Sequence, residues 1–429
     1  MTAPVSFEAA VEQAGDLVAR TERLDVDGAS LDPVALAGAH GVLFRRDGFT
    51  LAGRGEALRI AVTPAPSHRA AADAAEEALG AIAYAGGGAS DGFGVGPVAI
   101  GALPFTPAMG GSLVIPSEIT VIRDQEAWRT TVGRLGTEPA DEVRPDARPI
   151  ARSPSDFRLR AVPNHDDWRG AIEAALAAID DGGVRKVVLA RAVEVVADGP
   201  LVVTDVLRRL VALFPSCTTF SVDGFVGASP ELLIRRRAAD VRSQPLAGTV
   251  ARSGDPDTDA RLAAALMASA KDRREHAFVV EAVARALAPV CAELDTPAAP
   301  SVVPLRNVAH LATLIRGRLA GSASDWPSAL ALAALLHPTP AVAGTPTAAA
   351  LDLLAELEAE PRGRYAGPVG WVDARGDGEW VVGIRSAEVD GNRARLMSGV
   401  GVVAGSNPDA ELAETQLKLQ ALLAAIVRP

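Results

Sequence analysis

The chain has 429 residues, of which 48% are hydrophobic and 22% are charged. A chain of this length and apolar content can bury a large core, which excludes global disorder. Its formal net charge is −11 at pH 7, and it has no long basic runs. This charge pattern argues against nucleic acid or an anionic membrane as a partner.

Three further features of the sequence narrow the class of protein. No apolar stretch approaches the roughly 18 residues that a membrane-spanning helix needs. The first residues do not show the basic and apolar blocks of a signal peptide. The two cysteines, Cys217 and Cys291, are too few for a disulfide framework or a closed thiolate zinc site. We therefore expect a globular cytoplasmic protein.

Lysine is scarce in this chain. Only Lys186, Lys271 and Lys418 stand among the 42 basic residues, and the others are arginines. Arginine stays protonated in proteins, whereas the amine of lysine can lose its proton when it is buried. The three lysines are therefore candidates for chemistry that a guanidinium cannot perform, although three could also remain by chance.

The first 150 residues show short and broken patterns. Apolar residues at 42–44 and 49–52 flank Asp47-Gly48, which predicts a β-hairpin. An alanine-rich stretch over 67–84 predicts a helix. Residues 135–156 are rich in Pro, Asp, Glu and Arg without an apolar period, which indicates a linker or a long surface loop.

The rest of the chain shows denser patterns of both helical and strand period. Hairpins are mixed with helices that do not alternate regularly with strands, which indicates an α+β fold with a largely antiparallel sheet. Helices are predicted over 164–181, 203–213, 258–288, 325–336, 347–359 and 408–427. Strands are predicted over 185–196, 218–222, 225–228, 305–319, 369–372, 380–389 and 393–403.

Two candidate acid–base residues lie in or beside predicted strands. Lys186 shares one strand face with Val188 and Ala190. A partly buried amine near another cation has a lowered pKa and can act as a general base or a Schiff-base nucleophile. Glu231 follows Pro230 and precedes two leucines, and a carboxyl in such a setting can keep its proton and act as a general acid. A lysine that extends to solvent and a solvated turn glutamate are the alternatives.

Two predicted helices present paired carboxylates. Asp272 and Glu275 are three residues apart on one helix, and Glu411 and Glu414 are three apart on the last helix. Two such faces suit a hard divalent cation such as Mg²⁺, which takes oxygen ligands and keeps waters for a substrate. Solvated helix faces explain the same spacing, since Glu414 and Lys418 can form an ordinary i,i+4 ion pair.

Glycines that follow or lie within predicted strands mark places where the backbone approaches a neighbour or a ligand. Gly248-Thr249 and Gly399-Val400-Gly401 are two such places. The segment 336–344 contains two prolines that fix an irregular path. His310 and Arg385 lie in strand patterns and could hold a carboxylate or pair with local acids.

Taken together, these segments resemble the chorismate-utilising enzymes, and among them the isochorismate synthases. Residues 1–150 match only loosely, apart from 97–106. The resemblance therefore implies one chorismate-binding domain, 1–429, with a divergent half, 1–150, and a motif-bearing half, 151–429. The matching segments, which occur in the family's order, are Lys186–Arg191, Ser229–Leu233, Pro245–Thr249, Lys271–His276, Val308–Leu311, His337–Gly344, Arg362–Tyr365, Arg385, Ser398–Gly401 and Glu411–Lys418.

The resemblance implies an α+β domain whose two-layered, mostly antiparallel β core is flanked by helices, with the site in a cleft between the layers. It implies that Lys186 activates water for attack at C2 of chorismate and that Glu231 protonates the departing C4 hydroxyl. The implied Mg²⁺ ligands are Glu275 and Glu414, supported through water by Asp272 and Glu411. The implied substrate pocket is lined by Gly248, Thr249, His310, Ala341, Tyr365, Arg385, Gly399, Gly401 and Lys418.

Relatives within this family divide by the nucleophile that they use and by whether pyruvate is then released. Aminodeoxychorismate synthases tend to have a lysine at the position of Ala247, and salicylate synthases tend to have a threonine at the position of Ala341. Anthranilate synthases use ammonia, usually from a glutaminase partner, and differ in the loop 337–344. The resemblance therefore favours a monomer that forms isochorismate without a glutaminase subunit, for menaquinone or siderophore synthesis.

Three alternatives remain at this point. A salicylate synthase would release pyruvate from the same substrate. A Schiff-base lyase would use Lys186 as a nucleophile and need no metal. A binding module would hold a ligand without any acid–base chemistry.

Overall fold

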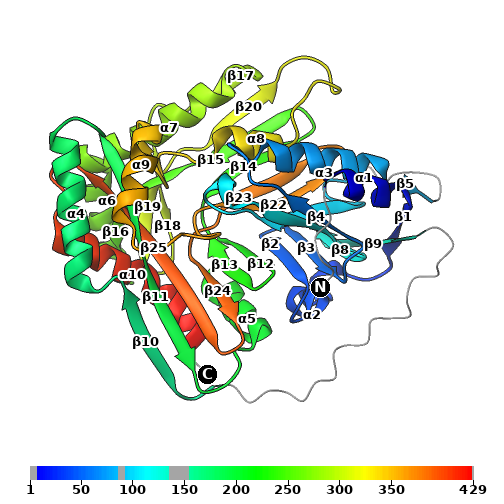
Figure 1. The fold of residues 1–429 in the computed structure, drawn as a ribbon, viewed down its shortest axis with the longest axis horizontal. Coiled ribbons are helices and arrows are strands. Elements are labelled where there is room, and N and C mark those ends of the chain that lie inside the picture. Colours follow the sequence, from blue (N-terminus) through cyan, green and yellow to red (C-terminus); the bar gives the residue numbers. More distant parts are fainter. Residues whose placement is uncertain (1–6, 86–91, 135–153, 428–429) are drawn as a thin grey trace.

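The computed structural model describes residues 7–85, 92–134 and 154–427, and its strands form three sheets (Figure 1). Most of the predicted linker, residues 135–153, lies outside the described part. Within that part, the strands pair antiparallel, except for the parallel pair β1–β5. The topology therefore has the antiparallel character that the sequence predicted.

The largest sheet has 13 strands and contains the strand that begins with Lys186. A two-strand pairing places β21 (Gly344–Thr345) beside β11, off the main path. The main path runs β10 (Phe157–Val162), β11 (Lys186–Ala197), β25 (Arg393–Val403), β24 (Ser386–Asp390), β13 (Phe225–Ser229), β12 (Thr218–Val222), β2 (Val42–Arg46), β3 (Phe49–Arg54), β8 (Glu118–Arg123), β9 (Glu126–Arg134), β1 (Leu17–Leu24) and β5 (Ala83–Tyr84).

Two smaller sheets complete the β structure. A three-stranded sheet has the order β16 (Leu246–Ala251), β19 (Val308–Ala312) and β18 (Ser301–Pro304). The nine-stranded sheet has the order β17 (Cys291–Asp295), β20 (Ile315–Leu319), β15 (Asp240–Gln244), β14 (Leu232–Arg237), β23 (Gly378–Val382), β22 (Pro368–Asp373), β6 (Val98–Ala102), β7 (Gly111–Ile115) and β4 (Leu58–Val62).

Helices cover the outer faces of the sheets (Figure 1). The nine-stranded sheet is covered by α8 (Ala329–Leu336), which contacts α3 (Arg69–Ala81), and α3 in turn contacts α1 (Phe7–Gly15). Near β11 and β25 lie α4 (His165–Asp180), α9 (Thr347–Leu357) and α10 (Pro408–Val427). The remaining described α-helices are α2 (Pro33–Ala37), α5 (Val203–Leu213), α6 (Pro256–Ala268) and α7 (Ala270–Leu287).

The two large sheets share one hydrophobic core. Phe44 and Phe220 of the 13-stranded sheet and Trp371 and Trp380 of the nine-stranded sheet are fully buried in it. Phe49 stacks on Trp371 across the layers, with ring centroids 5.3 Å apart. These observations confirm the predicted α+β fold with a two-layered β core. The small third sheet was not predicted.

Local sequence chemistry explains the elements that the patterns predicted. The Asp47-Gly48 hairpin forms between β2 and β3, and Gly48 adopts the left-handed φ of +68° that such a turn requires. The side chain of Asn164 caps the start of α4, whose Trp168 and Ile172 face the core as expected from the helical period.

Three predicted elements differ from the structure because each contains a break. The helix predicted over 258–288 is two helices, since Ser269 leaves helical geometry (ψ 116°) and its hydroxyl caps α7 by accepting from the amide of Asp272. The strand predicted over 305–319 is β19 and β20, which lie in different sheets. The strand predicted over 380–389 is β23 and β24, separated by Arg385 at φ +53°.

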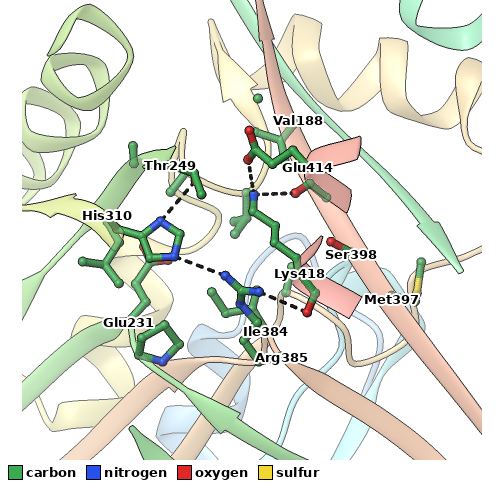
Figure 2. Close-up of a pocket in the computed structure, with 18 of the residues that line it drawn as sticks. Val188, Glu231, Thr249, His310, Ile384, Arg385, Met397, Ser398, Glu414 and Lys418 are labelled. Atoms are coloured by element: carbon green, nitrogen blue, oxygen red, sulfur yellow. Dashed lines mark hydrogen bonds and ion pairs between the residues drawn. The ribbon is translucent and has the colours of Figure 1, made fainter. Parts of the chain in front are cut away.

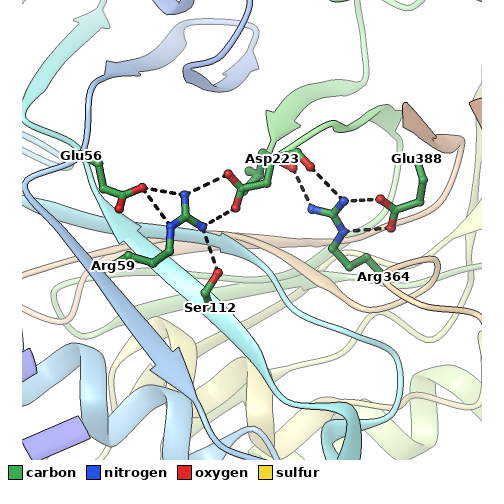
Figure 3. Close-up of polar contacts among 7 residues, drawn as sticks. Glu56, Arg59, Ser112, Asp223, Arg364 and Glu388 are labelled. Atoms are coloured by element: carbon green, nitrogen blue, oxygen red, sulfur yellow. Dashed lines mark hydrogen bonds and ion pairs between the residues drawn. The ribbon is translucent and has the colours of Figure 1, made fainter. Parts of the chain in front are cut away.

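A chain of ion pairs joins the two halves of the sequence at the edge of the core (Figure 3). Arg59 at the start of β4 bonds Asp223 in the β12–β13 turn at 2.7 Å and Glu56 at 2.8 Å. Arg364 donates to the carbonyl of Asp223 at 3.0 Å and to the carboxylate of Glu388 at 2.9 Å. Since Arg364 directly precedes a residue of the predicted substrate pocket, Tyr365, this network anchors one wall of that pocket.

Across the described residues, none of the helices has both the length and the apolar character that crossing a bilayer requires.

Candidate active site

One cavity gathers most of the predicted site residues (Figure 2). Its empty space, counted out into the open mouth, is about 830 Å³. The predicted residues that line it are Glu231, Gly248, Thr249, Glu275, His310, Ala341, Tyr365, Arg385, Gly399, Gly401, Glu414 and Lys418. Three predicted residues, Lys186, Asp272 and Glu411, are not part of this lining and lie beside residues that are.

Glycine positions shape the wall formed by β11 and β25. The two strands pair with Val188 opposite Gly401. A Cβ at residue 401 would collide with the carboxylate of Glu275 and come within 3.0 Å of Cε of Lys186. Gly248 has a φ of +77°, and a Cβ there would lie 3.1 Å from the Cβ of Asp272. Both glycines therefore allow the close approach that the sequence predicted.

Lys186 is enclosed between β11 and α7. Its side chain is 1% exposed, and its Nζ lies 3.0 Å from Oε1 of Glu275. This differs from the expectation of a partly buried amine beside a cation. On the same strand, Arg191 is an odd number of residues away, so it points to the other face, where it bonds Thr415. The charged group that contacts Lys186 is therefore the carboxylate of Glu275 and not a cation.

Glu231 lies between β13 and β14 and is 4% exposed. Burial raises the pKa of its carboxyl to about 8, although a hydrogen bond from the backbone of Leu246 and the charges of Lys186 and Lys418 act in the opposite direction. A carboxyl with this pKa is mostly protonated at pH 7 and can donate a proton. Burial thus favours the protonated form of Glu231, and its role as the acid stays a prediction.

Two helices bring acidic side chains to the other side of the cavity. Glu414 on α10 is 2.6 Å from Nζ of Lys418, and Glu411 is 3.4 Å from Nζ of Lys271. Burial raises the pKa of Glu411, and the charge of Glu414 raises it further. The pKa of Asp272 on α7 is raised by burial and then by the charges of Glu275 and Glu414. The carboxylates of α7 and α10 are therefore close enough to repel one another.

This donor set fits a hard cation chemically. Carboxylate oxygens are the ligands that Mg²⁺ prefers, and a cation between the helices would relieve the mutual repulsion. In the described ranges, however, no three His, Cys, Asp or Glu side chains are grouped closely enough to hold a metal ion. Instead, Glu275 and Glu414 are each paired with a lysine.

A cationic group faces these acids across the cavity (Figure 2). Nη1 of Arg385 donates to the carbonyl of Lys418 at 3.1 Å, and Nη2 donates to Nε2 of His310 at 3.2 Å. Nζ of Lys418 donates to the carbonyl of Gly399 at 3.0 Å. The cavity therefore holds two cationic side chains that could receive an anionic substrate.

Arg362 is a lining residue that was not predicted as part of the site. It is 5% exposed and donates to the carbonyls of Val188 and Val342 at 2.5 and 2.6 Å. It thereby ties β11 to the loop that contains Ala341. Burial raises the pKa of the neighbouring Tyr365 to about 12, so its hydroxyl keeps its proton. The sequence feature that could have identified Arg362 is its position in the segment Arg362–Tyr365, which resembles the family.

The cavity and its two cationic side chains suit the binding of a small anionic molecule. Comparison with known proteins gives the family. The family model described as "Chorismate binding enzyme" matches residues 43–427. The chain belongs to this family.

Individual relatives agree with the family assignment. The chain is 38% identical to isochorismate synthase DhbC of Bacillus subtilis over 341 residues, covering 77% of this chain and 81% of that protein. It is 37% identical to isochorismate synthase EntC of Escherichia coli, covering 76% and 80%. The solved structure of MenF, the menaquinone-specific isochorismate synthase of Escherichia coli, is 25% identical and superposes with a TM-score of 0.79 over 98% of this chain and 99% of that one.

Proposed function

We propose that this chain is a Mg²⁺-dependent isochorismate synthase, which converts chorismate to isochorismate reversibly. The main supporting observation is the buried Glu231 in the same cavity as Arg385. Burial raises the pKa of its carboxyl, and the charge of Lys186 acts on it in the opposite direction. An exchange of hydroxyl groups across a ring needs a base on one side and an acid on the other. The relatives DhbC and EntC, which are isochorismate synthases by name, support the choice of substrate.

The proposed reaction uses Lys186 as the base and Glu231 as the acid. Nζ of Lys186 takes a proton from a water molecule while the oxygen of that water bonds to C2 of chorismate. The ring double bonds shift, and the C4 oxygen leaves as water with the proton of Glu231. The ammonium formed on Lys186 is stabilised by the carboxylate of Glu275, 3.0 Å away.

The proposed substrate contacts follow from charge. Chorismate is a dianion, and Arg385 and Lys418 provide positive charge in a protein that is negative overall. Glu275 and Glu414 would hold Mg²⁺, with Asp272 and Glu411 in support through water. When bound, Mg²⁺ would supply further positive charge against the ring carboxylate. Gly248, Thr249, Ala341, Tyr365, Gly399 and Gly401 would shape the pocket around the ring.

We also propose that residues 1–429 act as one chorismate-binding domain. Strands from the first 150 residues and from the rest of the chain lie side by side in both large sheets, as in the pairs β2–β12 and β6–β22. Because water is the nucleophile, we expect no glutaminase subunit and a monomer that functions alone. The product would enter menaquinone or siderophore synthesis.

Incubation of the purified chain with chorismate tests this function. Products are separated by chromatography and identified by NMR, since chorismate and isochorismate have the same mass. Partial conversion to isochorismate, abolished by EDTA and restored by Mg²⁺, is the expected result. Formation of salicylate and pyruvate would replace the proposal with a salicylate synthase. If borohydride traps the substrate covalently on Lys186 and activity persists in EDTA, the chain is a Schiff-base lyase instead.

A further inference from the structure

The ring of His310 is held in one orientation by contacts at both nitrogens (Figure 2). His310 is 6% exposed and lies on β19, the central strand of the small sheet, opposite Thr249 of β16. Its Nδ1 lies 3.1 Å from the carbonyl oxygen of Gly248 and 3.1 Å from Oγ1 of Thr249. Its Nε2 lies 3.2 Å from Nη2 of Arg385.

These partners fix the tautomer of the ring. A guanidinium can only donate hydrogen bonds, so Nε2 must accept from Arg385. A backbone carbonyl can only accept, so Nδ1 must carry the proton that is donated to Gly248. The ring is therefore neutral. Burial and the positive charges of Arg385 and Lys418 also hold the pKa of His310 well below its ordinary value.

The contacts also leave the charge of Arg385 available. Its two described partners are the ring of His310 and the carbonyl of Lys418, and neither is anionic. A carboxylate in place of His310 would orient the guanidinium equally well but would neutralise it. A neutral acceptor orients the guanidinium and keeps its full charge for an anionic ligand.

We propose that His310 is a positioning residue, which holds the guanidinium of Arg385 for a substrate carboxylate and does not itself bind substrate or transfer a proton. This assignment rests on the proposed function, because it takes chorismate as the anion. It also extends to the metal side of the cavity. Oγ1 of Thr249 lies 3.1 Å from Nδ1 of His310, and the hydroxyl of Thr249 contributes to the lowered pKa of Glu414, which is a proposed metal ligand.

Two substitutions of His310 test the contacts of its two ring nitrogens separately. In His310→Gln the amide oxygen can stand near the position of Nε2 and accept from Arg385. In His310→Asn the shorter amide can replace only Nδ1, and the acceptor for Arg385 is lost. We expect KM for chorismate to stay within about threefold of wild type in the Gln variant and to rise about tenfold or more in the Asn variant, with kcat changed less than KM. Equal effects of the two variants, or a loss confined to kcat, would overturn the proposal.

A double-substitution cycle tests whether His310 acts through Arg385. In an Arg385→Ala background, His310→Asn should raise KM no further, because the group it positions is gone. Independent, multiplying effects would show that His310 contacts substrate directly. If thermal unfolding shows that the Asn variant does not fold, His310→Leu keeps a similar volume without the acceptor and takes its place in both comparisons.

Turnover of chorismate by the wild-type chain, measured in parallel, shows whether a failure concerns the role of His310 or the proposed synthase function. If wild type turns over chorismate but the KM values of the variants differ from those expected above, only the positioning role of His310 is refuted. If wild type does not turn over chorismate, the synthase assignment fails. The dissociation constant of chorismate, measured by calorimetry for the same variants, then decides the role of His310. A wild type that neither converts nor binds chorismate overturns both.

Discussion

Replacement of Glu231 by glutamine should abolish turnover and, at alkaline pH, stabilise the protein. Glutamine keeps the shape of the protonated carboxyl but cannot release a proton. Loss of a general acid typically lowers the rate about 10²- to 10⁴-fold. The effect on stability follows from the buried position of this carboxyl, whose pKa is raised to about 8 by desolvation.

The sign of the stability effect comes from proton linkage. The folded protein keeps a proton on Glu231 up to a pH of about 8, whereas the unfolded chain releases it near pH 4.5. Between these values the folded state binds more protons than the unfolded state, so stability falls as pH rises. Integrated from pH 5 to pH 9, this loss amounts to about 4 kcal/mol in wild type and is absent in Glu231→Gln.

Differential scanning fluorimetry at pH 5 and pH 9 measures this difference. For a chain of 429 residues, about 4 kcal/mol corresponds to a shift in Tm of about 4 °C. The gap in Tm between Glu231→Gln and wild type should therefore grow by about 4 °C between pH 5 and pH 9. Glu293→Gln on exposed β17 is the matched control and should show no such growth. A gap that does not depend on pH would refute the burial of a protonated Glu231.

Four further predictions test other parts of the site and fold. Gly401→Ala should lower kcat/KM at least tenfold because the methyl group collides with a cavity carboxylate, whereas Gly183→Ala, with its nearest neighbour atom 3.5 Å away, should not. Glu414→Ala should weaken Mg²⁺ and chorismate binding together, by about tenfold or more in calorimetry, and retained Mg²⁺ affinity would remove this residue from the metal site. Ala341→Thr places a hydroxyl in the wall at the position where salicylate synthases tend to have threonine, and pyruvate release in a coupled assay should appear. Asp223→Asn should lower Tm by about 1–2 °C through the loss of roughly 1–2 kcal/mol of charge-assisted hydrogen bonding, with kcat unchanged.

Residues that depend on local pattern were predictable from the sequence. Strand alternation placed Lys186 and Val188 on one face, and the glycine positions at 248 and 401 indicated close backbone approach. The structure bears out both features, since Val188 and the two glycines line the cavity and Lys186 lies beside it. Twelve of the residues named in advance meet in that lining. Most of them, such as Glu275 and His310, lie within helices or strands whose period is visible in the chain.

Breaks inside apolar patterns were not predictable in the same way. Ser269 interrupts one long helical period, and the residues on either side are good helix formers, so the pattern continues across it. Arg385 interrupts a strand pattern with φ +53°, a conformation that arginine rarely adopts. Its partner His310 is 75 residues away in the chain. Such contacts depend on how distant strands meet, and no local period encodes them.

The scarcity of lysine gains a physical meaning from the pairings. Each of the three lysines lies within ion-pair distance of a different carboxylate at the candidate metal site, with Nζ–O distances of 3.0 Å for Lys186, 3.4 Å for Lys271 and 2.6 Å for Lys418. Arginines form most other ion pairs in the described chain, often through two nitrogens, as Arg364 does with Glu388. A guanidinium fork holds a carboxylate in a fixed bidentate geometry, whereas an ammonium is a single, mobile point charge. Lys271 and Lys418 therefore neutralise their carboxylates without fixing their orientation, and Lys186 does the same for Glu275 once it has taken a proton. This suits carboxylates that must also serve a cation and a substrate.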